Sequence, residues 1–215
     1  MSDNDVDKQV VDQLYWDNSV QVADVGVTVD DGWVTLEGSV PSYSAKYTAE
    51  DDAYLVDGVK FVDNQLVVNY PTFPTDKQIK EDVKSALDWD FALDSQRIKV
   101  SVKDGTVKLL GTVDAYWKKT LAEDDAAKVN GVLYIVNELA IVTTGKWSDE
   151  TIGKDIEEAM RRNIFVDVND VDVKVKKGKV TLTGEVSNWA AKDAAYSSAL
   201  FTAGVVSIDN QITIS

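Results

Sequence analysis

The sequence contains no cysteine and no histidine among its 215 residues. Without cysteine there are no disulfide bonds and no thiolate nucleophiles, and without histidine there is no imidazole base and no Ser-His-Asp triad. Zinc sites built from these two residue types are excluded for the same reason. Carboxylate, lysine, tyrosine and Ser/Thr chemistry remain, but no motif singles out a pair among the 37 acids. We therefore expect a protein that is not an enzyme, with no metal and no cofactor.

Basic residues and long hydrophobic runs are also scarce. Lys and Arg number 22 against 37 Asp and Glu, which gives a formal net charge of −15. Such a chain repels phosphate groups, so we expect no nucleic-acid partner and little attraction to an anionic membrane surface. No stretch approaches the roughly 18 apolar residues of a transmembrane segment. The acidic start differs from a secretory signal, which predicts a cytoplasmic protein if Met1 is the native start and a periplasmic one if a signal peptide has been removed.

The sequence aligns with itself when it is shifted by 73 residues. Among the columns that hold the same residue in all three copies, three are Gly and one is Asn. These four columns are Gly32, Gly105 and Gly178; Gly38, Gly111 and Gly184; Gly58, Gly131 and Gly204; and Asn64, Asn137 and Asn210. This period predicts three tandem domains, at residues 1–73, 74–146 and 147–215.

Each copy shows the same order of local patterns. A Ser or Thr followed by Asp indicates the start of a first helix, whose apolar residues recur every four positions, as in Val6, Val10 and Leu14. Two alternating strands follow, joined by a tight turn such as Asp31-Gly32, and then an alanine-rich helix and a third apolar strand. We predict an α+β fold of three tandem α-β-β-α-β domains, each a three-stranded mixed sheet with two helices on one face.

The second strand and its surroundings carry a pattern that resembles the BON-domain family, of the OsmY-like kind. The pattern is G-x-V-x-L-x-G-x-V, followed by an Ala-rich helix, a Gly-Val pair and an Asn-x-(Leu/Ile) segment, and it starts at Gly32, Gly105 and Gly178. The resemblance covers essentially the whole chain. It implies a periplasmic or envelope protein that binds phospholipid or acts in osmotic and envelope stress.

The start of the second helix carries the candidate binding residues. One column holds an aromatic residue in every copy, and the column three residues later holds Lys. An aromatic ring beside an ammonium group suits a lipid headgroup or a phosphate ligand. The alternative is that the rings pack on the strand edge or on a neighbouring domain, while the lysines are solvated. The six residues are Tyr43, Lys46, Tyr116, Lys119, Trp189 and Lys192.

An acidic run on the second helix is a weaker candidate for binding a cation. It consists of residues 50–52 in the first copy and 123–125 in the second, and the third copy has Tyr196-Ser197-Ser198 instead. Successive helical residues diverge by about 100°, so three in a row do not converge on one ion. We interpret the run as a solvated face.

Charge and tryptophan differ between the copies. Asp and Glu outnumber Lys and Arg by 14 to 3 in the first copy, 12 to 11 in the second and 11 to 8 in the third. This polarity suits head-to-tail docking or a basic partner, and otherwise serves solubility. Trp16 and Trp89 share a column near the end of the first helix, where the third copy has Arg162. Exposed tryptophans would be candidates for an interface.

We predict a non-enzymatic triple BON-domain binding or scaffold protein, which the resemblance links to osmotic or envelope stress. Three similar surfaces on one chain add weak contacts through multivalency. The alternative is a protein that binds phospholipid, a small ligand or a cation. Its partner is accordingly another protein, or a membrane or lipid surface.

Overall fold

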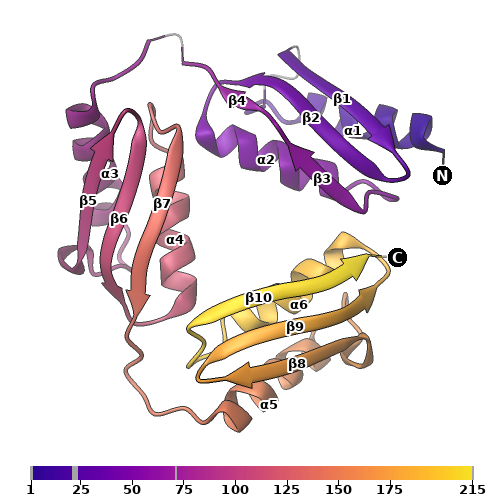
Figure 1. The fold of residues 1–215 in the computed structure, drawn as a ribbon, viewed down its shortest axis with the longest axis vertical. Coiled ribbons are helices and arrows are strands. Elements are labelled where there is room, and N and C mark those ends of the chain that lie inside the picture. Colours follow the sequence, from indigo (N-terminus) through magenta and orange to yellow (C-terminus); the bar gives the residue numbers. More distant parts are fainter. Residues whose placement is uncertain (1, 21–23, 71, 215) are drawn as a thin grey trace. The chain divides into compact units, whose positions relative to one another are not determined.

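The computed structural model of the chain describes residues 2–20, 24–70 and 72–214. Every repeat contains a helix, two strands, a second helix and a last strand, in that order (Figure 1). The first repeat contains α1 (Asp3–Trp16), β1 (Val25–Asp30), β2 (Trp33–Val40), α2 (Tyr43–Tyr54), β3 (Phe61–Asn64) and β4 (Val67–Val68). The second contains α3 (Asp76–Trp89), β5 (Ile98–Lys103), β6 (Thr106–Val113), α4 (Tyr116–Ala127) and β7 (Tyr134–Ile141). The third contains α5 (Asp149–Arg162), β8 (Val171–Lys176), β9 (Lys179–Val186), α6 (Trp189–Leu200) and β10 (Ser207–Ile214).

Each repeat has its own mixed sheet with the second strand in the middle. The first two strands form an antiparallel hairpin in every repeat. The last strand runs parallel to the middle strand, as the pairings of β3 with β2 and of β10 with β9 show. In the first repeat this last strand is interrupted after Asn64, and its second piece, β4, pairs with the end of β2. The predicted α+β fold with three-stranded mixed sheets is confirmed.

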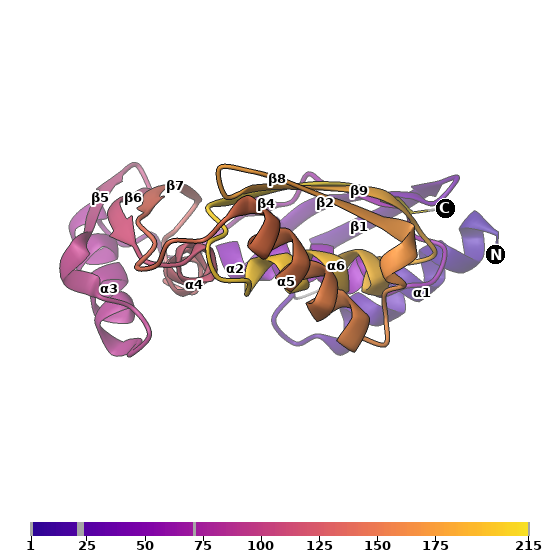
Figure 2. The same cartoon turned by 90° about the horizontal axis from the view of Figure 1, so that it is seen from below.

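The two helices of each repeat cover one face of its sheet and leave the other face open (Figure 2). The apolar residues four apart on the first helices are buried, as the periodicity predicts, and Val10 and Ile156 have no exposed surface. The alanines of the second helices let the helix backbone approach the sheet closely, and Ala49 and Ala195 are completely buried. Each hydrophobic core therefore lies between one sheet and its two helices.

The acid at the start of each first helix holds the hairpin turn of its repeat. In the third repeat the carboxylate of Asp149 accepts hydrogen bonds from the backbone N–H groups of Lys177 (2.8 Å) and Gly178 (2.9 Å). Both turn residues have positive φ, 54° and 73°, which turns their N–H groups toward a common acceptor. These bonds lower the pKa of Asp149. In the sequence this acid indicates only the start of the first helix, whereas the structure shows that it also ties the helix to the hairpin.

A glycine in the middle strand permits close contact with the chain entering the first strand. A Cβ at Gly184, whose φ is 142°, would overlap the carbonyl oxygen of Asp170, and the glycines of this column in the other repeats have the same environment. The column therefore reflects packing of backbone on backbone.

By the density of contacts, the chain divides into two compact units. One comprises Met1–Gly111 and Leu121–Glu138, and the other comprises Thr112–Thr120 and Leu139–Ser215. The start of α4 groups with the third repeat because Tyr116 packs against its core and the ring of Trp117 lies 6.4 Å from that of Phe201. The domain limits after residues 73 and 146 stay predictions, because the two compact units do not begin and end at these residues.

Candidate functional site

The first aromatic and lysine pair of the predicted site lies largely inside the protein. Tyr43 is 4% exposed, and its hydroxyl lies 2.7 Å from that of Tyr47 in the next turn of α2. Burial raises the pKa of Tyr43, and the contact with Tyr47 acts in the same direction. Lys46 is half-buried, and its carbonyl oxygen accepts a hydrogen bond from Asn64 (2.6 Å). At this position the ring is a packing residue, and Asn64 ties the last strand to α2.

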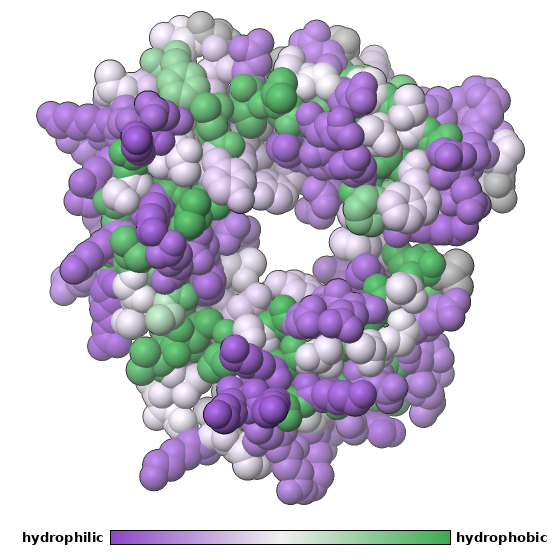
Figure 3. Space-filling model, in the orientation of Figure 1, coloured by the Kyte–Doolittle hydropathy of each residue, from purple (hydrophilic) through white to green (hydrophobic). Residues whose placement is uncertain are grey.

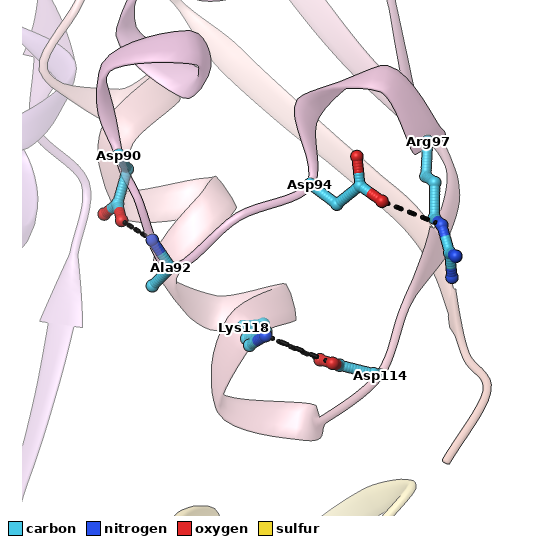
Figure 4. Close-up of polar contacts among 6 residues, drawn as sticks. All are labelled: Asp90, Ala92, Asp94, Arg97, Asp114 and Lys118. Carbon is cyan, nitrogen blue, oxygen red and sulfur yellow. Dashed lines mark hydrogen bonds and ion pairs between the residues drawn. The ribbon is translucent and has the colours of Figure 1, made fainter. Parts of the chain in front are cut away.

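The second repeat places a cation over an aromatic ring one residue away from the predicted column. Tyr116 is half-buried, as is Lys119. The ammonium group of Lys118 instead lies 5.5 Å from the ring of Trp117, and it forms an ion pair with Asp114 at 2.9 Å (Figure 4). The 73-residue alignment hides this pair, because Trp117 has no aromatic counterpart in the other repeats.

The third repeat keeps the predicted pair together. The ammonium group of Lys192 lies 5.7 Å from the ring centroid of Trp189, and both residues are half-buried at the start of α6. Burial lowers the pKa of Lys192. Beside α6, a cavity of about 510 Å³ opens toward α5, with Ser197 and Arg162 among its lining residues. Two of the three residues that replace the acidic run in this repeat, Ser197 and Ser198, therefore line this cavity.

The acidic run of the first two repeats forms the predicted solvated face only in part, because Asp51 and Asp124 are exposed while their neighbours are at least half-buried. Glu50 accepts a hydrogen bond from Asn64, and Glu123 accepts one from Asn137. Asp52 turns inward between α1 and α2, where it is 8% exposed and receives a hydrogen bond from Gln13 at 3.3 Å. Burial raises the pKa of Asp52. The run is thus divided among separate structural contacts, and the part of the chain that the structure describes holds no group of acids placed to bind a metal ion.

A recurrent surface that the predicted site does not include lies at the C-terminal end of the first helix of each repeat. We call residues 16–19, 89–92 and 162–165 the helix-end tips. Each tip exposes at least one large apolar side chain. The exposed fractions are 79% for Trp16, 80% for Trp89, 100% for Phe91, 90% for Ile164 and 62% for Phe165. The free energy falls when a partner covers such side chains, because their apolar surface is removed from water.

The same local turn builds all three helix-end tips. The residue after each first helix has extended backbone angles, and its side-chain oxygen accepts a hydrogen bond from the N–H group two residues further on. The three bonds run from Ser19 to Asp17 (2.7 Å), from Ala92 to Asp90 (2.7 Å) and from Phe165 to Asn163 (3.0 Å). Figure 4 shows the bond of the second repeat beside the pair between Arg97 and Asp94. These Asx turns fix the backbone from which the apolar side chains project.

The sequence contains part of this signal. Trp16 and Trp89 stand in one column, but the third repeat has Arg162 there and moves its apolar residues to the next positions. The oxygen-bearing column of Asp17, Asp90 and Asn163 marks the shared turn more reliably than the tryptophans do. Figure 3 shows that hydrophobic residues gather in several separate patches among hydrophilic side chains on the face it draws.

Comparison with protein families finds three copies of one domain in the chain. The BON domain matches residues 2–70, 75–143 and 148–215. Osmotically-inducible protein Y of Escherichia coli (strain K12) is 30% identical over 145 residues, which are 65% of this chain and 72% of that protein. A structure of CdsD, a structural protein of the type III secretion system of Chlamydia trachomatis, is 15% identical, with coverage of 98% and 92% of the two chains and a TM-score of 0.27. No helix within the described residues is long and apolar enough to cross a membrane.

Proposed function

The chain belongs to the BON domain family, and from this premise we propose that it is a non-enzymatic binding or scaffold protein whose three helix-end tips contact a protein partner. The observation that carries the proposal is the recurrence of exposed apolar side chains on the same Asx turn in all three repeats. Because the turn fixes the backbone before binding, little backbone entropy is lost on contact. Three weak contacts on one chain add to a useful affinity.

We place this role in osmotic or envelope stress, in the periplasm. The support is the relationship to Osmotically-inducible protein Y of Escherichia coli, whose name describes its induction. Weak single contacts suit a partner that is bound only under stress. Binding through several weak contacts depends steeply on local concentration, so a rise in concentration switches it on.

Site-specific photo-crosslinking in cells at raised osmolarity tests the proposal. A photoreactive residue is placed at Asn18, Phe91 or Ile164, one in each helix-end tip. Matched control positions are Leu55, Val67 and Val142, which are also exposed apolar residues but lie outside the tips. We expect the three tip positions to yield a common set of protein adducts that the controls do not yield. Equal adducts at tip and control positions would contradict the proposal.

The second candidate function is the binding of an anionic lipid or small ligand at Trp189 and Lys192. The specific support is the ammonium group of Lys192, which lies over the indole ring of Trp189 at the start of α6. Co-sedimentation with vesicles containing an anionic phospholipid at low salt checks it. Binding that Lys192→Gln abolishes and that Lys174→Gln leaves unchanged would favour this candidate over the protein partner, and absence of binding would exclude it.

A further inference from the structure

The open face of the first sheet carries two neighbouring aromatic rings that are exposed. Trp33 in β2 lies opposite Phe61 in β3, and their ring centroids are 4.7 Å apart at an interplanar angle of 45°. The two residues remain 57% and 43% exposed. On its other side Trp33 pairs with Asp30 of β1. One row of paired residues across β1, β2 and β3 therefore places a carboxylate, an indole ring and a phenyl ring side by side.

Carboxylates continue from this row along the open face. The next row places Thr35 opposite Asp63, and the row beyond it contains Glu37. Asp30, Glu37 and Asp63 are exposed, and none of them forms an ion pair with a described residue. Asp63 accepts one hydrogen bond, from the side chain of Gln65 (2.7 Å). The four strands of this repeat contain no Lys and no Arg.

The third repeat shows that the fold does not require this face. At the positions of Asp30, Trp33 and Phe61, its sheet has Lys176, Lys179 and Ser207, which pair in the same way across β8, β9 and β10. At these positions the third repeat therefore carries positive charge in place of negative charge, and it has no aromatic ring there. The aromatic and acidic face belongs to the first repeat, which also carries 14 acids against 3 basic residues.

We propose that this open face binds a polypeptide segment of another protein that presents Lys or Arg side chains. A guanidinium or ammonium group packs against the rings of Trp33 and Phe61, which attract cations through their faces. Asp30 and Asp63 on either side of the rings neutralise its charge. The excess negative charge of the first repeat attracts such a segment over a longer range.

The spacing of the rows favours an extended segment. Rows on one face of a strand are two residues apart, or roughly 6.7 Å, and alternate side chains of an extended peptide have the same spacing. A segment lying along the strands can therefore place one cation over the ring pair and the next ones beside Asp63 and Glu37. The same acids repel anionic lipid headgroups and phosphate, which sets this face apart from the site at Trp189.

Fluorescence anisotropy of a labelled peptide with alternating Arg and Ser tests the proposal on the full chain. We expect binding at low salt that weakens as salt is added. Asp30→Lys with Asp63→Lys should weaken it by about tenfold or more, because like charges then face each other. Trp33→Ala with Phe61→Ala should weaken it ~2- to 5-fold, the usual contribution of an exposed cation and ring pair.

The control variant changes the same amount of charge elsewhere on the first repeat. Asp12→Lys with Asp57→Lys replaces two exposed acids outside the open face, and we expect much less weakening from it. If both charge variants weaken binding equally, or if removing the rings has no effect, then net charge alone explains the binding and the proposal is overturned. Sedimentation of the chain alone completes the test. The chain could instead associate with itself and bind no peptide. If Lys176→Glu with Lys179→Glu then abolishes this self-association, the face binds a second copy of the chain, and the proposal of another protein as partner is overturned.

Discussion

At the scale of single residues, the Gly and Asn columns shared by all three repeats include positions where an added side chain would meet other atoms and positions where a polar group completes a contact. At the glycine of the middle strand an added Cβ would overlap a carbonyl oxygen, as it would at Gly184 with Asp170. The asparagine of the last strand bonds to the second helix in the first two repeats. These columns maintain the fold, and the surfaces proposed for binding use other residues.

Two glycines of the third repeat should respond to alanine in opposite ways. Gly184→Ala places a Cβ on a backbone oxygen at a φ of 142°, and we expect a loss of about 3 kcal/mol or more in the free energy of unfolding. Gly153 lies within α5, where an added Cβ would contact Val175 at an ordinary 3.7 Å. Gly153→Ala should therefore stabilise by about 0.5–1 kcal/mol. Denaturant unfolding measures both, and similar effects would contradict the contact described at Gly184.

The buried acid of the first repeat should make stability fall as pH rises. Burial raises the pKa of Asp52 above its usual 3.8, so its carboxyl stabilises the fold below pH 3.8, where it is protonated in both states, and this contribution is lost as pH rises through the folded pKa. One carboxylate oxygen has no partner among the described residues. Asp52→Asn should accordingly stabilise by about 1 kcal/mol at neutral pH and have little effect near pH 3.8. Thermal unfolding at the two pH values checks this, and a destabilised variant at neutral pH would contradict it.

At the scale of elements, the sequence predicts the helices and strands well because their signals are local. Apolar residues four apart define the face of each first helix, and alternation with a Gly turn defines each hairpin. The candidate site was harder to predict, because it depends on what each ring meets in three dimensions. Tyr43 and Trp189 share a column, yet one is buried beside Tyr47 and the other is half-exposed beside Lys192. The sequence indicates the helix-end tips only in the first two repeats, through Trp16 and Trp89, because the third repeat carries its apolar residues at Ile164 and Phe165 instead.

The bond between the first helix and the hairpin turn should be measurable by hydrogen exchange. Asp149→Asn weakens the acceptor of the N–H groups of Lys177 and Gly178, and we expect both amides to exchange faster. Asp172→Asn, which changes an exposed acid of β8, is the control and should leave them unchanged. Unaltered protection in the Asp149 variant would show that the turn holds without the carboxylate.

The same variant has a pH dependence opposite to that of Asp52. The pKa of Asp149 lies below its usual 3.8 in the folded chain, so the carboxylate stabilises the fold above pH 3.8, and this contribution is lost as pH falls through the folded pKa. The difference in melting temperature between the parent and Asp149→Asn should therefore be largest near neutral pH and shrink in acid. A difference that grows in acid would contradict the assignment.

At the scale of the whole molecule, charge is distributed unevenly over three similar folds. The first repeat has an excess of eleven acids over basic residues, whereas the second has an excess of one. Like charges within a small domain repel one another and lower its stability. Added salt should therefore slow hydrogen exchange in β1–β3 more than in β5–β7, because it screens the larger repulsion. Peptide-resolved exchange at low and moderate salt measures this, with the second repeat as the internal control for general salt effects.

The parallel last strand of each repeat also governs how the chain folds while it is being made. Val62 of β3 pairs with Val34, 28 residues earlier, so the first sheet closes only when the ribosome has released the segment up to β4. From that moment the first repeat has every strand it needs, while the second is still emerging at some 5–20 residues per second. The first sheet can therefore be completed without any strand of the other two repeats.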